Sequence, residues 1–177
     1  MKSQDDCESI IERIRSEEDI GRHRYRSNLA IEAARLGCRE VKPFLLRYLV
    51  ADNPFLREEG LRGLQDLGAR EERPRIMDLF HKDPDSCVRQ TALVCLDILF
   101  LGEADKEILQ MALKAFEDKD SYIGLRLAAG AVMMHQLQIP HDEQGGPAWW
   151  NEDEPEWLEH PAIIQAVEET KKLLDAS

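Results

Sequence analysis

The chain contains 177 residues, 43% of them hydrophobic, and its 23 basic and 35 acidic side chains give it a formal net charge of −12. This length predicts one folded domain, and the apolar content excludes a disordered chain. The 10 glycines and 8 prolines are neither enriched nor periodic, which excludes collagen-like and low-complexity chains. No apolar run reaches the roughly eighteen residues that span a bilayer, and the charged start MKSQDDCESI is not typical of a signal peptide. We therefore expect a cytoplasmic protein with no membrane partner.

The charge is distributed unevenly along the chain. Residues 1–75 contain 15 basic and 15 acidic side chains, residues 76–126 contain 6 and 10, and residues 127–177 contain 2 and 10. No lysine or arginine occurs between Arg126 and Lys171, while nine aspartates or glutamates do. Because such a surface repels nucleic acid and attracts basic proteins, we expect a basic protein partner and no nucleic acid.

Apolar residues recur at helical spacing along most of the chain, and almost nowhere do they alternate as in a strand. After an N-terminal helix within 1–21, the apolar stripes fall at 25–36, 41–49, 56–67, 76–80, 88–99, 108–116 and 123–132. Gly37, Gly68 and Gly102 each follow one of these stripes and are expected to be helix C-caps. The sequence predicts an all-α fold.

Every second predicted helix begins with a similar segment. The four segments are HRYRSNLAIEAARLG, ADNPFLREEGLRGL, KDPDSCVRQTALVCL and DKDSYIGLRLAAGAV. Their equivalent residues Tyr25, Leu56, Val88 and Ile123 are 31, 32 and 35 residues apart. A period of this length is typical of stacked helical hairpins.

The pattern of an Asp-Pro-type turn, then Val-Arg, then small residues and leucines resembles a HEAT or HEAT-like repeat, the bilin-lyase type included. The resemblance covers residues 22–138, and the fourth copy has Gly124 where arginine is expected. It implies an α–α superhelix, a short solenoid of about four helix pairs. Residues 1–177 are then one domain, with a capping helix at 1–21, repeats at 22–138, a loop at 139–159 and a C-terminal helix at 160–177.

The resemblance also implies a role for four repeated polar residues. A turn aspartate and a helix arginine form a structural ladder between successive repeats of the family. The residues that match this ladder are Asp52, Arg57, Asp83 and Arg89. We expect them to be architectural, because a pair that recurs in each unit serves stacking and not a single active site.

The residue types that carry catalysis are present without a catalytic pattern. Cys7, Cys38, Cys87 and Cys95 include no CxxC pair, so we expect reduced, mostly buried thiols that form neither a zinc site nor a redox pair. The five histidines show no HExxH motif, and glycine-rich nucleotide motifs and GxSxG are missing. The sequence therefore predicts a protein with no metal, no cofactor and no catalytic residues.

The acidic loop at 139–159 is the candidate partner-binding site, because its tryptophans stand among carboxylates. The candidate residues are Trp149, Trp150, Trp157, Asp142, Glu143, Glu152, Asp153 and Glu154. Tryptophan is enriched at binding hot spots, and an acidic surround suits a basic partner. Two interpretations stay open, since the rings either seal the end of the repeat array or contact the partner.

These features favour a non-enzymatic protein-binding module, a small acidic inhibitor such as a bacterial immunity protein that neutralises a basic, nuclease-like toxin. A general scaffold or adaptor, a bilin-lyase-like subunit and a HEAT-like nucleic-acid-binding or glycosylase-like protein are the alternatives. The basic cluster Arg22, Arg24 and Arg26 bears on the last of these, because it is either an anion site or a solvated helix start.

Overall fold

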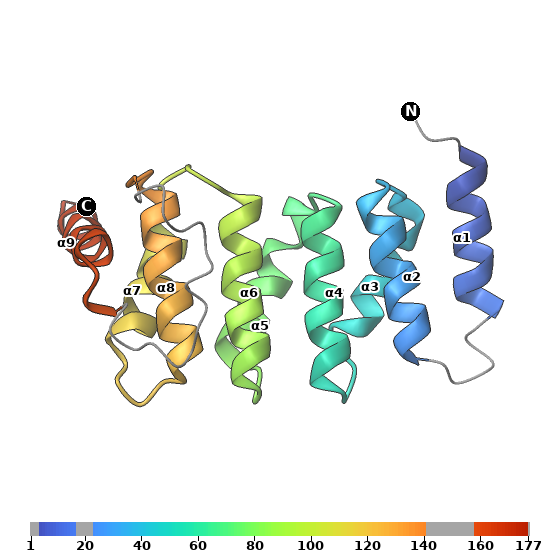
Figure 1. Ribbon diagram of the computed structural model, residues 1–177, viewed down its shortest axis with the longest axis horizontal. Helices are drawn as coiled ribbons and strands as arrows, with labels where there is room; N and C mark the ends of the chain where they lie inside the picture. The colour runs from blue at the N-terminus through green and yellow to red at the C-terminus, as the bar shows by residue number, and fades with distance from the viewer. Residues whose placement is uncertain (1–3, 17–22, 141–157, 177) are drawn as a thin grey trace. The chain divides into compact units, whose positions relative to one another are not determined.

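Helices are the only long regular elements in the part of the chain that the computed structural model describes, residues 4–16, 23–140 and 158–176 (Figure 1). This confirms the all-α class. The chain divides into an N-terminal unit, residues 1–75, and a C-terminal unit, residues 76–177. The boundary coincides with the change in charge, because the N-terminal unit is formally neutral. The C-terminal unit contains 8 basic and 20 acidic side chains and so carries the whole net charge of −12.

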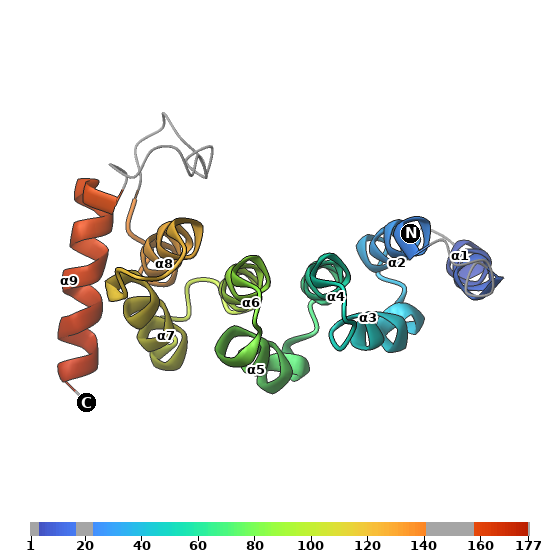
Figure 2. The same ribbon diagram turned by 90° about the horizontal axis from the view of Figure 1, so that it is seen from below.

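The N-terminal unit is built from short helices packed in sequence order. They are α1 (Gln4–Ser16), α2 (His23–Arg35), the 3-10 helix η2 (Arg39–Val41), α3 (Lys42–Tyr48), α4 (Pro54–Asp66) and the 3-10 helix η3 (Arg70–Glu72). Helix α2 contacts α1 and α4, and α3 packs against α4 (Figure 2). At Gly60 of α4 a Cβ atom would lie 2.9 Å from the carbonyl oxygen of Leu45. The lack of a side chain there lets α3 and α4 approach closely.

The helices of the C-terminal unit pack mainly around one helix, residues 123–136. The unit begins within α5 (Arg73–Lys82). It continues with α6 (Ser86–Leu99), α7 (Lys106–Glu117), α8 (Ile123–Gln136) and α9 (Pro161–Asp175). Helix α8 packs against both α6 and α7, and α9 crosses α7 and α8 (Figures 1 and 2). Gly130 of α8 allows this crossing, because its Cα faces the side chain of Ile163 in α9, 3.1 Å from an ideal Cβ position.

The helix ends follow the signals in the sequence. Gly37, Gly68 and Gly102 have φ angles of 79°, 63° and 71°, the left-handed conformation expected of glycine C-caps. Asp85 and Asp105 each accept hydrogen bonds from two backbone N–H groups in the first turns of α6 and α7. These caps satisfy donors that have no partner within the helix.

Cys7 and Cys38 form a disulfide, so the expectation of four reduced thiols is wrong for this pair. The two residues are 31 positions apart in sequence, and they meet because α1 packs against α2 and η2. A spacing of that length gives no sequence signal for pairing. Cys87 and Cys95 are not part of a disulfide, and the first is exposed while the second is buried.

The two units do not by themselves divide the chain into two domains. In a repeat array each repeat contacts only its neighbours, so clusters of contacts also arise within one domain. The single domain at 1–177 therefore stays a prediction. None of the helices built from the described residues has both the length and the hydropathy of a membrane-spanning segment.

Candidate protein-binding site

All eight candidate binding residues of the predicted loop lie in 141–157, outside the described residues. The described chain stops at Pro140 and continues at Leu158, which leads into α9. The structure therefore defines the surface from which the loop departs.

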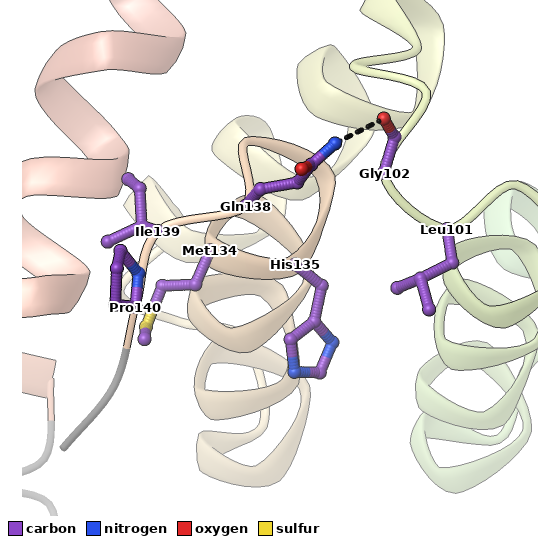
Figure 3. Close-up of a pocket in the computed structure, with 7 residues that line it drawn as sticks. All are labelled: Leu101, Gly102, Met134, His135, Gln138, Ile139 and Pro140. Atoms are coloured by element: carbon purple, nitrogen blue, oxygen red, sulfur yellow. Dashed lines mark hydrogen bonds between the residues drawn. The ribbon is translucent and has the colours of Figure 1, made fainter.

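A pocket of about 470 Å³ lies at that point of departure, where the end of α8 faces the turn after α6 (Figure 3). Its lining residues are Leu101, Gly102, Met134, His135, Gln138, Ile139 and Pro140. Figure 3 shows Met134, Ile139 and Pro140 on one side, Leu101 on the opposite side and His135 between them. The side chain of Gln138 joins the two sides, because its Nε2 donates a hydrogen bond of 3.0 Å to the carbonyl oxygen of Gly102.

A buried polar network fixes His135 in this pocket. Asp97 of α6 is only 2% exposed, and one oxygen of its carboxylate lies 2.7 Å from Nδ1 of His135. The other oxygen accepts a hydrogen bond of 3.0 Å from Nε2 of Gln136, which is 1% exposed. Because an ionised carboxylate only accepts hydrogen bonds, this geometry assigns the imidazole proton to Nδ1.

Gln136 also holds the turn between α6 and α7. Its Nε2 donates to the carbonyl oxygen of Phe100 at 3.0 Å, and its Oε1 accepts from the backbone N–H of Asp105 at 3.2 Å. One side chain thus satisfies backbone groups at the end of α6 and the start of α7. The turn that forms one wall of the pocket is fixed to α8.

The contact with Asp97 raises the pKa of His135 above its usual value of 6.5, and the partial burial of the imidazole opposes this shift. The hydrogen bond to the carboxylate stabilises the protonated ring more than burial destabilises it. The pocket therefore favours a positive charge at one point of an otherwise uncharged lining.

Apolar side chains are exposed around the same turn. Leu101 is 60% exposed and Ile98, one helical turn earlier in α6, is 47% exposed. Large apolar groups beside a pocket are typical of binding surfaces. An arrangement of this kind can receive an apolar or aromatic side chain of another protein.

The two lysines within residues 127–177 both form ion pairs. Lys171 of α9 lies 2.6 Å from a carboxylate oxygen of Glu117 in α7, and Lys172 lies 2.9 Å from Glu169. Nδ1 of His160 accepts a hydrogen bond of 3.3 Å from the backbone N–H of Ala162 and caps α9. These contacts leave the acidic character of this end of the chain unchanged.

Two of the ladder side chains, Arg57 and Asp83, bond to nearby backbone. The guanidinium of Arg57, 8% exposed, donates to the carbonyl oxygens of Ala51 at 2.8 Å and Asp52 at 2.9 Å. The Asp83 carboxylate accepts from the backbone N–H of Asp85 at 2.9 Å. Arg126 likewise bonds to a backbone carbonyl, because its Nε donates to the carbonyl oxygen of Phe116 at 3.0 Å. A ladder between successive repeats stays a prediction.

Arg89 differs from the other ladder arginine. Its Nε is buried and has no hydrogen-bond partner among the described residues.

In the basic cluster, Arg22 and the side chains of Arg24 and Arg26 lie outside the described part of the chain. Within that part, no group of three or more histidine, cysteine or carboxylate side chains is placed to hold a metal ion.

Sequence reasoning missed His135, Asp97 and Gln136. A signal was present, because Asp97 interrupts the apolar run LVCLDILF and Gln136 follows the apolar run of α8. A polar residue on a buried helical face requires a partner. The sequence alone does not show that these two positions, 39 residues apart, supply that partner to each other.

One comparison with known proteins gives a match. A family model described as HEAT repeats matches residues 7–97, which is just over half of the chain. No curated protein and no solved structure matches. The matched stretch runs from Cys7 in α1 to Asp97 in α6.

Proposed function

Because the chain belongs to the family of HEAT repeats, whose members commonly mediate protein–protein interactions, we propose that it is a non-enzymatic binding module for a basic protein. The observation that carries the proposal is the charge of the C-terminal unit, which contains 8 basic and 20 acidic side chains. A field of one sign attracts oppositely charged proteins over distances longer than a contact. The N-terminal unit, with no net charge, does not contribute to this attraction.

The pocket beside α8 supports a place for the contact. It combines apolar walls with exposed Leu101, and the chain leaves it at Pro140 to enter the acidic segment with the three tryptophans. Electrostatic attraction gives orientation and speed, while buried apolar groups give most of the affinity. The C-terminal unit supplies both.

The finer proposal is an inhibitor that binds a basic, nuclease-like toxin in the cytoplasm. Its support is the small size of the chain, its acidity and the absence of catalytic motifs from its sequence. A scaffold or adaptor shares these features and differs only in what binding does to the partner.

The test begins with the tagged full-length protein on a resin, exposed to a lysate of its native source and washed with rising salt. We expect the proteins released by salt to be basic. Each is then purified and assayed for its own activity with one equivalent of the chain. Loss of activity supports the inhibitor, and binding with full activity supports the scaffold. Capture of acidic proteins or nucleic acid alone would reject both.

Two substitutions separate a structural role of the tryptophans from a binding role. If the rings contact the partner, Trp149→Ala or Trp150→Ala weakens binding by about 2 kcal/mol or more with an unchanged melting temperature. If they cap the repeat array, the melting temperature falls and binding is lost only as the protein unfolds. Phe55→Ala is the control, since it removes a 37% exposed ring from the neutral N-terminal unit.

A further inference from the structure

The disulfide lies beside a second cavity, in the N-terminal unit. Cys7 of α1 is partly exposed and lines a cavity of about 290 Å³ together with Glu8, Ile11, Glu12, Arg15 and Glu40. Its partner Cys38, just before η2, is buried at 1% exposure. The Cα atoms of the two residues are 5.6 Å apart. The bond is therefore reached from solvent on the α1 side and anchored in the core on the other.

Apart from the disulfide, α1 is held mainly by one apolar face. Ile10, Ile11 and Ile14 are buried, and the helix contacts α2 and η2. An isolated helix of 13 residues is marginal in water, so α1 depends on these contacts for its structure. A cross-link between Cys7 and Cys38 favours them by keeping the partners close in space.

The lining of the cavity contains more acidic than basic side chains. Glu8 and Glu12 of α1 and Glu40 of η2 line the same cavity, where Arg15 is the one basic residue among the lining side chains. Carboxylates of like charge repel each other when they share a site.

We propose that the Cys7–Cys38 bond is a redox switch that fixes α1 on α2 and η2 when it is formed and lets α1 detach when both residues are thiols. Disulfides in reducing compartments are mostly transient or regulatory, whereas a permanent one is typical of oxidising compartments. The partial exposure of Cys7 gives a reductant access without unfolding of the unit. This inference concerns the N-terminal unit, and of the proposed function it rests only on the cytoplasmic location.

The chemistry is thiol–disulfide exchange with a dithiol reductant. A thiolate of the reductant attacks one sulfur of the bond, which forms a mixed disulfide and releases the other cysteine as a thiolate. The second thiolate of the reductant then attacks the mixed disulfide and releases the remaining cysteine. Two electrons pass from the reductant, which becomes a disulfide, and the released thiolates take up two protons. Oxidised glutathione, a disulfide oxidant, drives the reverse reaction.

The reference protein is the full chain with Cys87→Ser, which removes an exposed thiol outside the disulfide. It is equilibrated with oxidised glutathione or with dithiothreitol under native conditions, and the free thiols are alkylated and located by mass spectrometry. Hydrogen exchange is then measured on both forms. We expect amides of residues 4–16 to exchange at least about tenfold faster after reduction, while amides of α4 and α8 keep their rates.

A second variant separates the bond from side effects of the reagent. Adding Cys7→Ser and Cys38→Ser to the reference should give the exchange rates of its reduced form, with or without dithiothreitol. If that variant does not fold, the comparison of oxidised and reduced reference protein decides alone. The proposal is overturned if no Cys7–Cys38 bond forms with oxidised glutathione, if the bond resists dithiothreitol until the protein unfolds, or if α1 is equally protected in both forms.

Discussion

The carboxylate of Asp97 in α6 lies 2.7 Å from Nδ1 of His135 in α8, so a buried acid holds the imidazole that lines the pocket. Gln136, the next residue, binds the second oxygen of the same carboxylate. The helix pair, the following turn and the pocket wall are thereby joined by a few side chains. Three consequences for stability follow from this network and from the arginines, and a fourth prediction concerns binding.

The first prediction concerns pH. Asp97 raises the pKa of His135 above 6.5, so the contact stabilises the fold fully below about pH 6.5 and this contribution is lost as the pH rises through the higher pKa of the folded state. The melting temperature of the wild type should exceed that of His135→Gln most at about pH 6 and less at about pH 9. Subtracting the two curves removes titrations that both proteins share. Parallel curves would contradict the assignment.

The second prediction compares two glutamines. Gln136→Met leaves polar groups of Asp97, Phe100 and Asp105 without this partner, and we expect a loss of about 3 kcal/mol in the free energy of unfolding. Gln138→Met removes one exposed hydrogen bond to Gly102 and should cost less than about 1 kcal/mol. Urea denaturation of both variants measures the difference. Equal losses would show that the Gln136 network does not stabilise the unit.

The third prediction compares two arginines. Arg57→Met removes the donor to the carbonyl oxygens of Ala51 and Asp52 and should cost about 2 kcal/mol. Arg89→Met should change the free energy of unfolding by less than about 1 kcal/mol, because it removes a buried Nε that has no partner among the described residues. The same denaturation experiment applies. A larger loss for Arg89→Met would favour the ladder role expected from the sequence.

The helices were predictable because their signals are local. Apolar spacing located each helix of the repeats, and Gly37, Gly68 and Gly102 ended three of them in the conformation that glycine favours. The fourth repeat segment has Gly124 where the repeat pattern has arginine, and this difference also has a structural reason. A Cβ there would lie 2.7 Å from Cε1 of Tyr122 and 2.9 Å from Oε1 of Gln90, so α8 passes close to α6 at this point.

The long-range contacts were not predictable because no local signal encodes them. Cys7 meets Cys38 only through the packing of α1, and Asp97 meets His135 only through the packing of α6 on α8. Each pair joins residues more than thirty positions apart, a separation close to the length of one repeat. A periodic sequence predicts that successive repeats pack, but which polar side chains meet depends on the register of that packing.

The most direct test of the central claim measures the association rate of the chain with the captured basic partner between about 50 and about 500 mM salt. Two variants with the same change in charge are compared with the wild type. One carries Glu152→Gln, Asp153→Asn and Glu154→Gln in the acidic segment. The other carries Glu12→Gln, Glu32→Gln and Glu40→Gln in the N-terminal unit, at exposed positions.

If the C-terminal unit captures a basic protein, the wild-type association rate falls steeply with salt, because the range of electrostatic attraction shortens. At low salt the acidic-segment variant associates about tenfold more slowly and depends less on salt, while the N-terminal variant matches the wild type. An association rate that does not change with salt, or an equal loss in both variants, would contradict the claim.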